Sequence, residues 1–413
     1  MQYGLIGEHL GHSYSREIHE QLADYAYELR ELPPEALPTF LAARDFRAIN
    51  VTIPYKQSVI PYLDEISDTA RAIGAVNTIV NRNGRLFGDN TDFAGLRALL
   101  MRLGLRLSGK KVLILGTGGT SKTARAVAEA MGAAQILRVS RAAGCGDIIS
   151  YAQALAAHTD AQILINTTPV GMYPRQEEQP ISLAAFPRLE GVTDAVYHPL
   201  RTKLVLEAQS RGIPAQGGLF MLAAQAAAAC AIFRGREPDT AQAERAFSAV
   251  LREKQNLVLI GMPTSGKTTV GKRLAARSGK RFLDTDALLT EQFGISIADY
   301  FAKNGEEAFR TREEALVRSL ATESGCVIAT GGGVILREEN LRRLRQNGLL
   351  IFLDRAPEKL IAADDRPLSA SREALLQRYR ERYGRYCAAA DLQINANGSV
   401  WEVVCAIEKE LTR

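Results

Sequence analysis

The segment from Gly261 to Thr268, GMPTSGKT, constrains the fold of this chain more than any other stretch. It follows the apolar run Leu257–Ile260, which is typical of a buried parallel strand, and helical sequence begins near Lys267. Glycines let the backbone N–H groups of such a loop turn inward, and the start of the helix adds positive potential. The pattern predicts a phosphate-binding loop (P-loop), in which Lys267 reaches the β- and γ-phosphates of a nucleotide and Thr268 binds Mg²⁺. The alternative is a Gly-rich turn between core elements.

The composition is that of a soluble globular protein, and 413 residues predict two or three domains. The net charge of +5 is spread along the chain without a block of like charge, so we expect small anionic ligands and no nucleic-acid partner. The most apolar run, Leu219–Phe233, is too short to cross a bilayer. We therefore expect a buried helix there and no membrane partner.

The five cysteines lie far apart and form no C-x-x-C pair, which argues against a disulfide framework or a zinc site. Free thiols are typical of a reducing compartment, and the N-terminal sequence lacks the basic and apolar regions of a signal peptide. We therefore expect a cytoplasmic protein. The sequence carries no indication of the oligomeric state.

Short strands and helices alternate in the first hundred residues, and Asn83-Gly84 predicts a two-residue hairpin turn. The strands expected there are Tyr3–Ile6, Tyr25–Leu29, Ala48–Ile53, Ala75–Asn81 and Leu86–Gly88. A second unit starts at Gly109 as a βαβ motif, and an Ala-rich helix is expected at 220–233. Its expected strands are Lys111–Leu115, Gln135–Val139, Ala161–Asn166 and Val192–Ala195. A helix at 240–254 then leads through a short linker near 254–256 into a third unit.

A second nucleotide site is predicted at the turn after the strand Lys111–Leu115. Gly116, Gly118 and Gly119 form the start of a dinucleotide fingerprint, although Ser121 stands where a third glycine is usual. The next strand ends at Ser140-Arg141, where an NAD enzyme generally has an acidic residue. A cation and a hydroxyl suit a 2′-phosphate, so the sequence favours NADP(H). The alternative for Arg141 is a solvated loop arginine.

Polar motifs at strand ends and loops surround this turn, and each one alone is more often a cap or a turn than a site. Together they resemble shikimate dehydrogenase over about residues 1 to 250. The motifs in family order are HSYS (12–15), NVTIPYK (50–56), GAVNT (74–78), GDNTD (88–92), GTGGTS (116–121), NTT (166–168) and GLFMLAAQ (218–225).

The resemblance implies roles for several of these residues. Lys56 and Asp92 would be the catalytic pair at the reacting hydroxyl, because an ammonium beside a carboxylate can protonate and stabilise the alkoxide formed by hydride addition. The residues that would hold the cyclic polyol acid are Ser13, Ser15, Thr52, Asn77 and Gln225, with Tyr197 near the same ligand. Met221 would lie near the nicotinamide, and Thr167 near the cofactor. One departure is Arg16, where the family usually has proline.

The P-loop unit needs an acceptor site, and Asp284-Thr285-Asp286 follows the expected strand Arg281–Leu283. In an extended segment these two carboxylates point to one side. One would serve Mg²⁺ and the other a sugar-like hydroxyl; the alternative is a helix N-cap. Further on, Gly305–Arg310 starts a helix, and three glycines at 331–333 allow close approach of backbone to a ligand.

This set resembles shikimate kinase over residues 256 to 413. The resemblance implies that Asp284 joins Thr268 at Mg²⁺ and that Asp286 positions or deprotonates the shikimate hydroxyl. Lys267 and Arg366 would act on the transferring phosphoryl group. Shikimate would also be held by Arg310, Gly332, Gly333 and Arg382, and ATP by Gly261, Ser265, Gly266, Lys267, Thr268 and Thr269. The lid segment Ile361–Arg366 departs from the family because it is short and acidic.

We therefore predict an α/β protein with a two-lobed dehydrogenase followed by a P-loop kinase domain with a parallel sheet. The predicted parts are a substrate-binding lobe (1–100), a Rossmann-like NADP-binding lobe (101–220), C-terminal helices (221–254) and the kinase domain (255–413). The predicted function is reduction of 3-dehydroshikimate to shikimate with NADPH, followed by phosphorylation of shikimate with MgATP. Two alternatives stay open: a degenerate kinase-like sensing module fused to the dehydrogenase, and an NAD-dependent quinate/shikimate dehydrogenase.

Overall fold

The computed structural model describes residues 1–11, 13–360 and 372–412. The chain forms two compact units, Met1–Leu251 and Arg252–Arg413, here unit 1 and unit 2. One residue separates the end of helix α9 (Thr240–Lys254) from the start of strand β13 (Asn256–Ile260). The linker expected near 254–256 is thus reduced to Gln255, because the helix runs almost to the strand.

The first lobe of unit 1 is a mixed sheet with the strand order β2-β1-β3-β5-β6-β4. Its strands are β1 (Tyr3–Gly7), β2 (Tyr27–Glu31), β3 (Ala48–Val51), β4 (Glu65–Ile66), β5 (Thr78–Arg82) and β6 (Arg85–Asp89). The hairpin predicted between β5 and β6 is present, with Asn83 at φ 55° and Gly84 at φ 86°. Helices α1 (Ser15–Leu22), α2 (Leu37–Ala43) and α3 (Asp68–Ile73) accompany this sheet. Strand β5 starts later than expected, so Asn77 lies in the loop before it.

The second lobe is a parallel sheet with the order β12-β11-β10-β7-β8-β9. Its strands are β7 (Lys111–Leu115), β8 (Gln135–Ser140), β9 (Ile148–Ser150), β10 (Ile163–Asn166), β11 (Gly191–Asp194) and β12 (Ala215–Gln216). Alternate residues of β7 enter two cores: Val112 and Ile114 pack with α5 (Gly119–Ala130), whereas Leu113 and Leu115 pack with α6 (Tyr151–Ala157) and α7 (Lys203–Ser210). This is the doubly wound arrangement that the βαβ pattern predicted.

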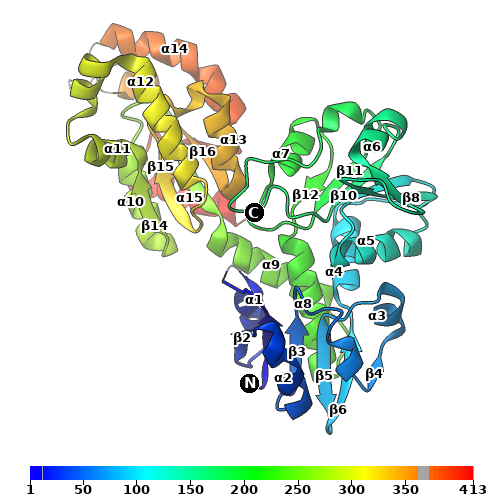
Figure 1. Cartoon of the computed structure of the whole chain (residues 1–413). Coiled ribbons are helices and arrows are strands. Elements are labelled where there is room, and N and C mark those ends of the chain that lie inside the picture. The colour runs from blue at the N-terminus through cyan, green and yellow to red at the C-terminus, as the bar shows by residue number, and fades with distance from the viewer. Residues whose placement is uncertain (12, 361–371, 413) are drawn as a thin grey trace. The chain divides into compact units, whose positions relative to one another are not determined.

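Helices α4 (Asp92–Arg102) and α8 (Leu219–Arg234) lie between the two sheets of unit 1 (Figure 1). They approach closely at Gly95, where a Cβ would stand 2.6 Å from the carbonyl oxygen of Met221 and 2.9 Å from Cβ of Gln225. A side chain at position 95 would therefore push the helices apart. The close approach brings Met221 and Gln225 onto the turn of α4 that begins with Asp92.

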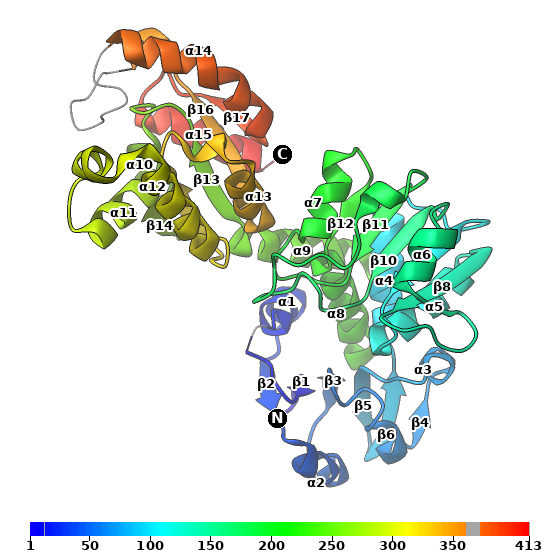
Figure 2. The same cartoon turned by 45° about the horizontal axis from the view of Figure 1, so that its top comes forward.

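Unit 2 is a three-layer α/β/α domain around a parallel sheet with the order β14-β15-β13-β16-β17 (Figure 2). The remaining strands are β14 (Arg281–Asp284), β15 (Cys326–Ala329), β16 (Gly348–Asp354) and β17 (Leu392–Asn395). One face packs against α10 (Lys267–Ser278) and α15 (Val400–Leu411). The other face packs against α11 (Thr285–Phe293), α12 (Ile297–Leu320), α13 (Glu338–Asn347) and α14 (Arg372–Ala389).

The helix expected to start at Gly305 is present as the second part of α12, which is interrupted at Gly305 with φ 79° and ψ 170°. The glycine permits this left-handed kink, after which Glu306 to Arg310 form a fresh helical turn. Within the described residues, none of the helices combines the length and the apolar character needed to cross a lipid bilayer.

Candidate active sites

An ion pair between Lys56 and Asp92 marks the first candidate site, in unit 1. Lys56 Nζ lies 2.6 Å from Asp92 Oδ2, and the two side chains are 18% and 5% exposed. Asp92 is the first residue of α4, where a carboxylate is stabilised by the helix dipole. Lys56 follows β3, which brings it to the same edge of the first lobe. The structure thus joins the two residues that the sequence proposed as a catalytic pair.

Asn77 completes this cluster and is itself fixed by its neighbours. Its Nδ2 donates to Asp92 Oδ1 at 3.0 Å, and its Oδ1 accepts from the backbone N–H of Thr91 at 2.7 Å. Thr78 Oγ1 donates to the same Oδ1 at 3.0 Å. Asn50 Nδ2 reaches Thr78 Oγ1 at 3.1 Å and the carbonyl oxygen of Asn77 at 3.2 Å. The sequence analysis assigned no role to these three supporting residues, because a polar residue that orients another polar residue leaves no separate motif.

The other proposed substrate residues of unit 1 come from different elements. Ser13 Oγ donates to Ser15 Oγ at 3.0 Å, just before α1. The ring of Tyr197 lies 5.3 Å from that of Tyr14, the residue between the two serines. Burial raises the pKa of Tyr197 to about 12, so its hydroxyl stays protonated at neutral pH and can donate a hydrogen bond.

Thr52 and Gln225, two further proposed substrate residues, are described by the backbone contact of the one and the buried side-chain oxygen of the other. The backbone N–H of Thr52 donates to the carbonyl oxygen of Ile6 at 3.0 Å, one residue beyond the end of β3. Gln225 Oε1 is a buried oxygen that accepts no hydrogen bond from the described part of the chain. A buried carbonyl without a donor is costly, so it suits a ligand hydroxyl. Its position on α8 against α4 fits a role at the Asp92 cluster.

The glycine turn after β7 has the geometry of a phosphate-binding turn. Gly116 has φ 107°, and a Cβ there would stand 2.9 Å from Thr167 Oγ1. By contrast, a Cβ on Gly118 or Gly119 would meet nothing within 4 Å, so this side of the turn is open at the start of α5. Ser121, at the usual third-glycine position, is buried and donates from Oγ to the carbonyl oxygen of Gly116 at 2.7 Å. The Ser121 hydroxyl therefore stabilises the turn through a hydrogen bond on its buried side.

The proposed 2′-phosphate residues lie at the end of β8. Ser140 ends this strand, and Arg141 follows it as an exposed side chain. Burial raises the pKa of Tyr151 and the charge of Arg141 opposes that rise, which places the guanidinium near the start of α6. Arg141 is thus an exposed residue one position beyond the end of β8, the strand that pairs with β7.

Asp194, which the sequence analysis did not select, connects the segment that precedes Thr167 with the segment that precedes Tyr197. Its carboxylate accepts from Asn166 Nδ2 at 2.9 Å, from the Val196 N–H at 3.0 Å and from Thr202 Oγ1 at 2.7 Å. Burial raises the pKa of Asp194 to about 7 despite these donors. Asn166 precedes Thr167 and Asp194 lies three residues before Tyr197, so this contact holds the two loops together.

The second candidate site, in unit 2, begins with the P-loop predicted at 261–268. Gly261 and Gly266 have φ 148° and 97°, and Gly266 is the N-cap of α10. Lys267 is 7% exposed, and its Nζ donates to the carbonyl oxygens of Gly261 at 2.9 Å and Met262 at 2.8 Å. The ammonium therefore lies folded over the loop, in reach of a phosphate bound there. Ser265 and Thr269 flank the same turn.

The segment Asp284-Thr285-Asp286 differs from the extended arrangement expected. Asp284 is the N-cap of α11, and its Oδ1 accepts from the N–H of Asp286 at 3.0 Å, so Asp286 lies in the first helical turn. The helix starts here because the cap satisfies N–H groups that have no partner in the helix. Asp284 Oδ2 still accepts from Thr268 Oγ1 at 2.7 Å. One carboxylate is thus both the cap and the neighbour of the P-loop threonine.

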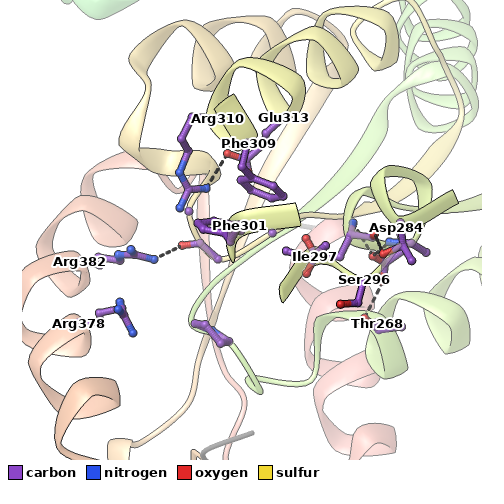
Figure 3. Close-up of a pocket in the computed structure, with 17 residues that line it drawn as sticks. Thr268, Asp284, Ser296, Ile297, Phe301, Phe309, Arg310, Glu313, Arg378 and Arg382 are labelled. Carbon is purple, nitrogen blue, oxygen red and sulfur yellow. Dashed lines mark hydrogen bonds and ion pairs between the residues drawn. The ribbon is translucent and has the colours of Figure 1, made fainter. Parts of the chain in front are cut away.

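Thr268, Asp284 and Asp286 are among the residues that line a cavity of about 380 Å³ (Figure 3). The three glycines at 331–333 form one wall, and each is in close contact: a Cβ would stand 2.7 Å from Asp286 Oδ1 at Gly331, 2.8 Å from Pro263 Cδ at Gly332 and 2.1 Å from Arg310 Nη1 at Gly333. Arg382 also lines the cavity and donates from Nη1 to the carbonyl oxygen of Gly332 at 3.0 Å. The structure thus brings together all the acceptor residues proposed from sequence.

Glu313 and Arg378 line this cavity as well, although the sequence analysis did not select them. Glu313 is 1% exposed and accepts from Arg310 Nη1 at 2.8 Å. Burial raises the pKa of Glu313, and the charge of Arg310 opposes that rise. The proposed lid residue Arg366 lies outside the described residues.

Mg²⁺ prefers oxygen ligands and usually binds through one or two carboxylates together with substrate phosphates. Among the described residues, no group of three or more His, Cys, Asp or Glu side chains is placed to bind a metal by itself. Thr268 Oγ1 and Asp284 Oδ2 fit the protein's share of such a site, since they are oxygens in contact at the P-loop edge of the cavity.

Comparison with known proteins gives separate matches for the two units. The family model described as shikimate dehydrogenase substrate binding domain matches residues 5–79, and the model described as shikimate kinase matches residues 263–412. Shikimate dehydrogenase (NADP(+)) of Geobacillus kaustophilus (strain HTA426) is 37% identical over 271 residues, which cover 60% of this chain and 98% of the relative. The chain belongs to the shikimate dehydrogenase family.

Other relatives and solved structures agree with this assignment. Shikimate dehydrogenase (NADP(+)) of Clostridium perfringens (strain SM101 / Type A) is 35% identical over 59% of this chain and 96% of its own length. The structure of shikimate dehydrogenase 1 from Peptoclostridium difficile matches with 32% identity and a TM-score of 0.56, over 60% of this chain and 98% of that one. The Thermus thermophilus enzyme in complex with NADP(H) and shikimate matches with 31% identity and a TM-score of 0.55, over 60% and 99%.

The kinase model covers the part of the chain that follows the dehydrogenase match. The protein is therefore a shikimate dehydrogenase fused to a shikimate kinase domain, a bifunctional enzyme of the shikimate pathway. This confirms the predicted α/β fold class and the predicted combination of activities. The dehydrogenase relatives named above also support NADP as its cofactor, and a kinase domain implies ATP.

Proposed function

We propose that the part of the chain from 1 to 254 reduces 3-dehydroshikimate to shikimate with NADPH, and that the part from 255 to 413 converts shikimate to shikimate 3-phosphate with MgATP. The observation that carries the proposal is that each unit has both a polar cluster and a glycine-rich turn at the start of a helix. The Lys56–Asp92 pair is that cluster in unit 1, and the cavity next to the P-loop holds it in unit 2. We also propose a cytoplasmic location, which the five free cysteines support.

In the dehydrogenase, hydride addition to the ketone creates an alkoxide that needs a proton. Lys56 lies against Asp92, so the carboxylate holds the ammonium in position, and the ammonium can donate a proton to the alkoxide and become a neutral amine. Asn77 holds the second oxygen of Asp92 and keeps the carboxylate turned toward Lys56. We assign substrate binding to Ser13, Ser15, Thr52, Asn77, Tyr197 and Gln225, and cofactor binding to Gly116, Gly118, Gly119, Ser140, Arg141, Thr167 and Met221.

In the kinase, phosphoryl transfer depends mainly on positioning and on stabilisation of charge. Asp286 lies against Gly331 in the cavity wall, where its carboxylate can accept a proton or hydrogen bond from the acceptor hydroxyl. Lys267 would turn from the loop carbonyls to the phosphates. Thr268 and Asp284 would hold Mg²⁺, which neutralises charge on the transferring group when bound.

A single reaction mixture tests the proposal. The purified chain receives 3-dehydroshikimate, NADPH and MgATP, while NADPH loss and ADP release are followed together. We expect NADPH to be consumed first and ADP to appear only as shikimate accumulates. NADPH loss without ADP release, also when shikimate is added directly, would mean that unit 2 is a sensing module. Absence of NADPH loss would remove the dehydrogenase assignment.

Arg141→Ala tests the choice of NADP(H). The 2′-phosphate would lose a charged partner, so we expect the KM for NADPH to rise roughly tenfold or more, while the KM for NADH stays within about twofold. Steady-state reduction of 3-dehydroshikimate with each cofactor measures both values. Arg188→Ala, another exposed arginine of the same lobe, is the control. An equal change in the KM values for NADPH and NADH would show that Arg141 does not bind the 2′-phosphate. It would then favour the alternative of an NAD-dependent dehydrogenase.

A further inference from the structure

Helix α14 carries two arginines that line the kinase cavity, one turn apart. Arg382 was expected there, but Arg378 was not. Residues four positions apart lie on the same face of a helix, so both side chains are directed to the same wall. Figure 3 shows Arg378 beside Arg382, with Arg310 on the same side of the cavity.

The three arginines of the cavity lie away from its P-loop edge, and one of them, Arg310, also contacts the carboxylate of Glu313. Arg310, Arg378 and Arg382 occupy one side, whereas Asp284 and Thr268 lie on the opposite side, next to the P-loop (Figure 3). An acceptor in this cavity would therefore present its reacting hydroxyl to the side of Asp284 and Thr268, next to the P-loop. An anionic group elsewhere on the same acceptor would face the arginines.

Arg310 and Arg382 differ in how much the protein balances their charge. Arg310 donates from Nη1 to Glu313 at 2.8 Å and from Nη2 to Glu306 at 3.1 Å, so both ends of its guanidinium contact carboxylates. Arg382 donates from Nη1 to a neutral carbonyl oxygen, that of Gly332. The α14 side of the cavity is therefore better suited to attract an anion than the surroundings of Arg310.

Arg378 is electrostatically unfavourable where it stands. Burial lowers the pKa of Arg378, and the nearby charge of Arg382 lowers it further, with only partial compensation from Glu306 and Glu381. Two guanidinium groups on the same cavity wall repel each other, and a bound anion would offset that repulsion. Such an arrangement is typical of a site that is completed by an anionic ligand.

We propose that Arg378 is a substrate-binding residue of the kinase, which holds the carboxylate of shikimate together with Arg382. The proposal rests on the function proposed above, because it takes shikimate as the acceptor. The other anion in this reaction is the transferring phosphoryl group. The position of Arg378 opposite Thr268 and Asp284 favours the carboxylate, since those two residues mark the phosphate side.

Arg378→Gln is the main test, with kinase activity followed by ADP release in the absence of nicotinamide cofactor. We expect the KM for shikimate to rise roughly ten- to a hundredfold, because a hydrogen-bonded charge pair is lost, while the KM for ATP stays within about twofold. Arg380→Gln removes an exposed arginine of the same helix and should leave both values unchanged. Arg378→Lys keeps the charge and should recover part of the affinity.

The methyl ester of shikimate separates the two anions. It lacks the carboxylate charge, so its KM should be high and nearly the same for the wild-type chain and Arg378→Gln. A variant that impairs shikimate and the ester equally would overturn the proposal in favour of phosphoryl contact or packing, and an unchanged KM for shikimate would overturn it outright. If the wild-type chain fails to phosphorylate shikimate, both the proposed kinase function and the role of Arg378 are wrong. If the wild-type chain phosphorylates shikimate but the Arg378 variants behave like it, only the role of Arg378 is wrong.

Discussion

Replacing Lys56 with alanine should lower kcat/KM for 3-dehydroshikimate reduction by about three orders of magnitude. Lys56 Nζ is 2.6 Å from Asp92 Oδ2 in the wild-type protein, so the variant loses the proton donor and leaves a 5% exposed carboxylate without its cation. General acid catalysis alone contributes about a hundred- to ten-thousandfold, and the unpaired charge of Asp92 opposes the developing alkoxide. Initial rates of NADPH oxidation at several 3-dehydroshikimate concentrations give the value.

The phosphorylation of added shikimate by the same Lys56→Ala preparation should stay within about twofold of wild type. Lys56→Arg is the matched variant, because it keeps a positive charge beside Asp92 but does not release a proton near neutral pH. Its dehydrogenase activity should remain low if proton donation is the main role. Nearly full NADPH turnover by Lys56→Ala would contradict the catalytic assignment, and loss of both activities in a folded protein would contradict independent sites.

The parts of the protein that sequence predicted well are those in which several residues at fixed spacing serve one purpose. The P-loop and the GTGGTS turn demand glycines at particular backbone angles, such as Gly116 at φ 107° and Gly266 at φ 97°. Such demands leave a pattern that is visible in one chain. Lys56 and Asp92 lie in the motifs NVTIPYK and GDNTD, and the resemblance to shikimate dehydrogenase, which rests on the order of these motifs, paired them.

The residues that sequence missed act through contacts between distant segments. Glu313 appears as one more charged residue on an amphipathic helix until folding buries it against Arg310. Arg378 lies on a helix with several exposed arginines, and only the cavity distinguishes it from them. Asp194 likewise gains its role from Asn166 and Thr202, which come from other loops.

The Asp284 segment shows how two sequence interpretations can both be partly right. The carboxylate caps α11, which was the alternative, and it also contacts Thr268, which was the functional expectation. The expectation of an extended segment was wrong for Asp286, because the cap at Asp284 starts the helix at Thr285 and so places Asp286 in its first turn. A carboxylate has two oxygens, so capping and ligand binding do not exclude each other.

Lys267→Ala should lower the kcat/KM of the kinase for ATP by about a hundred- to thousandfold, with dehydrogenase activity unchanged. The ammonium of Lys267 is 7% exposed and contacts the carbonyl oxygens of Gly261 and Met262, so alanine removes the loop's main cation from a desolvated site. A preorganised donor of this kind is worth about a hundred- to thousandfold where charge develops. Initial rates of ADP release at saturating shikimate measure the effect.

Two comparisons show whether that loss comes from the phosphates. Lys272→Ala removes an exposed lysine from the same helix, α10, and should keep kinase activity within about twofold. Because Lys267 is assigned to the β- and γ-phosphates, Lys267→Ala should weaken ATP binding more than AMP binding, whereas a general disturbance of the loop would weaken both alike. Kinase activity close to wild type in Lys267→Ala would reduce the P-loop to a glycine-rich turn, in which Lys267 only fastens the loop through the carbonyl oxygens of Gly261 and Met262.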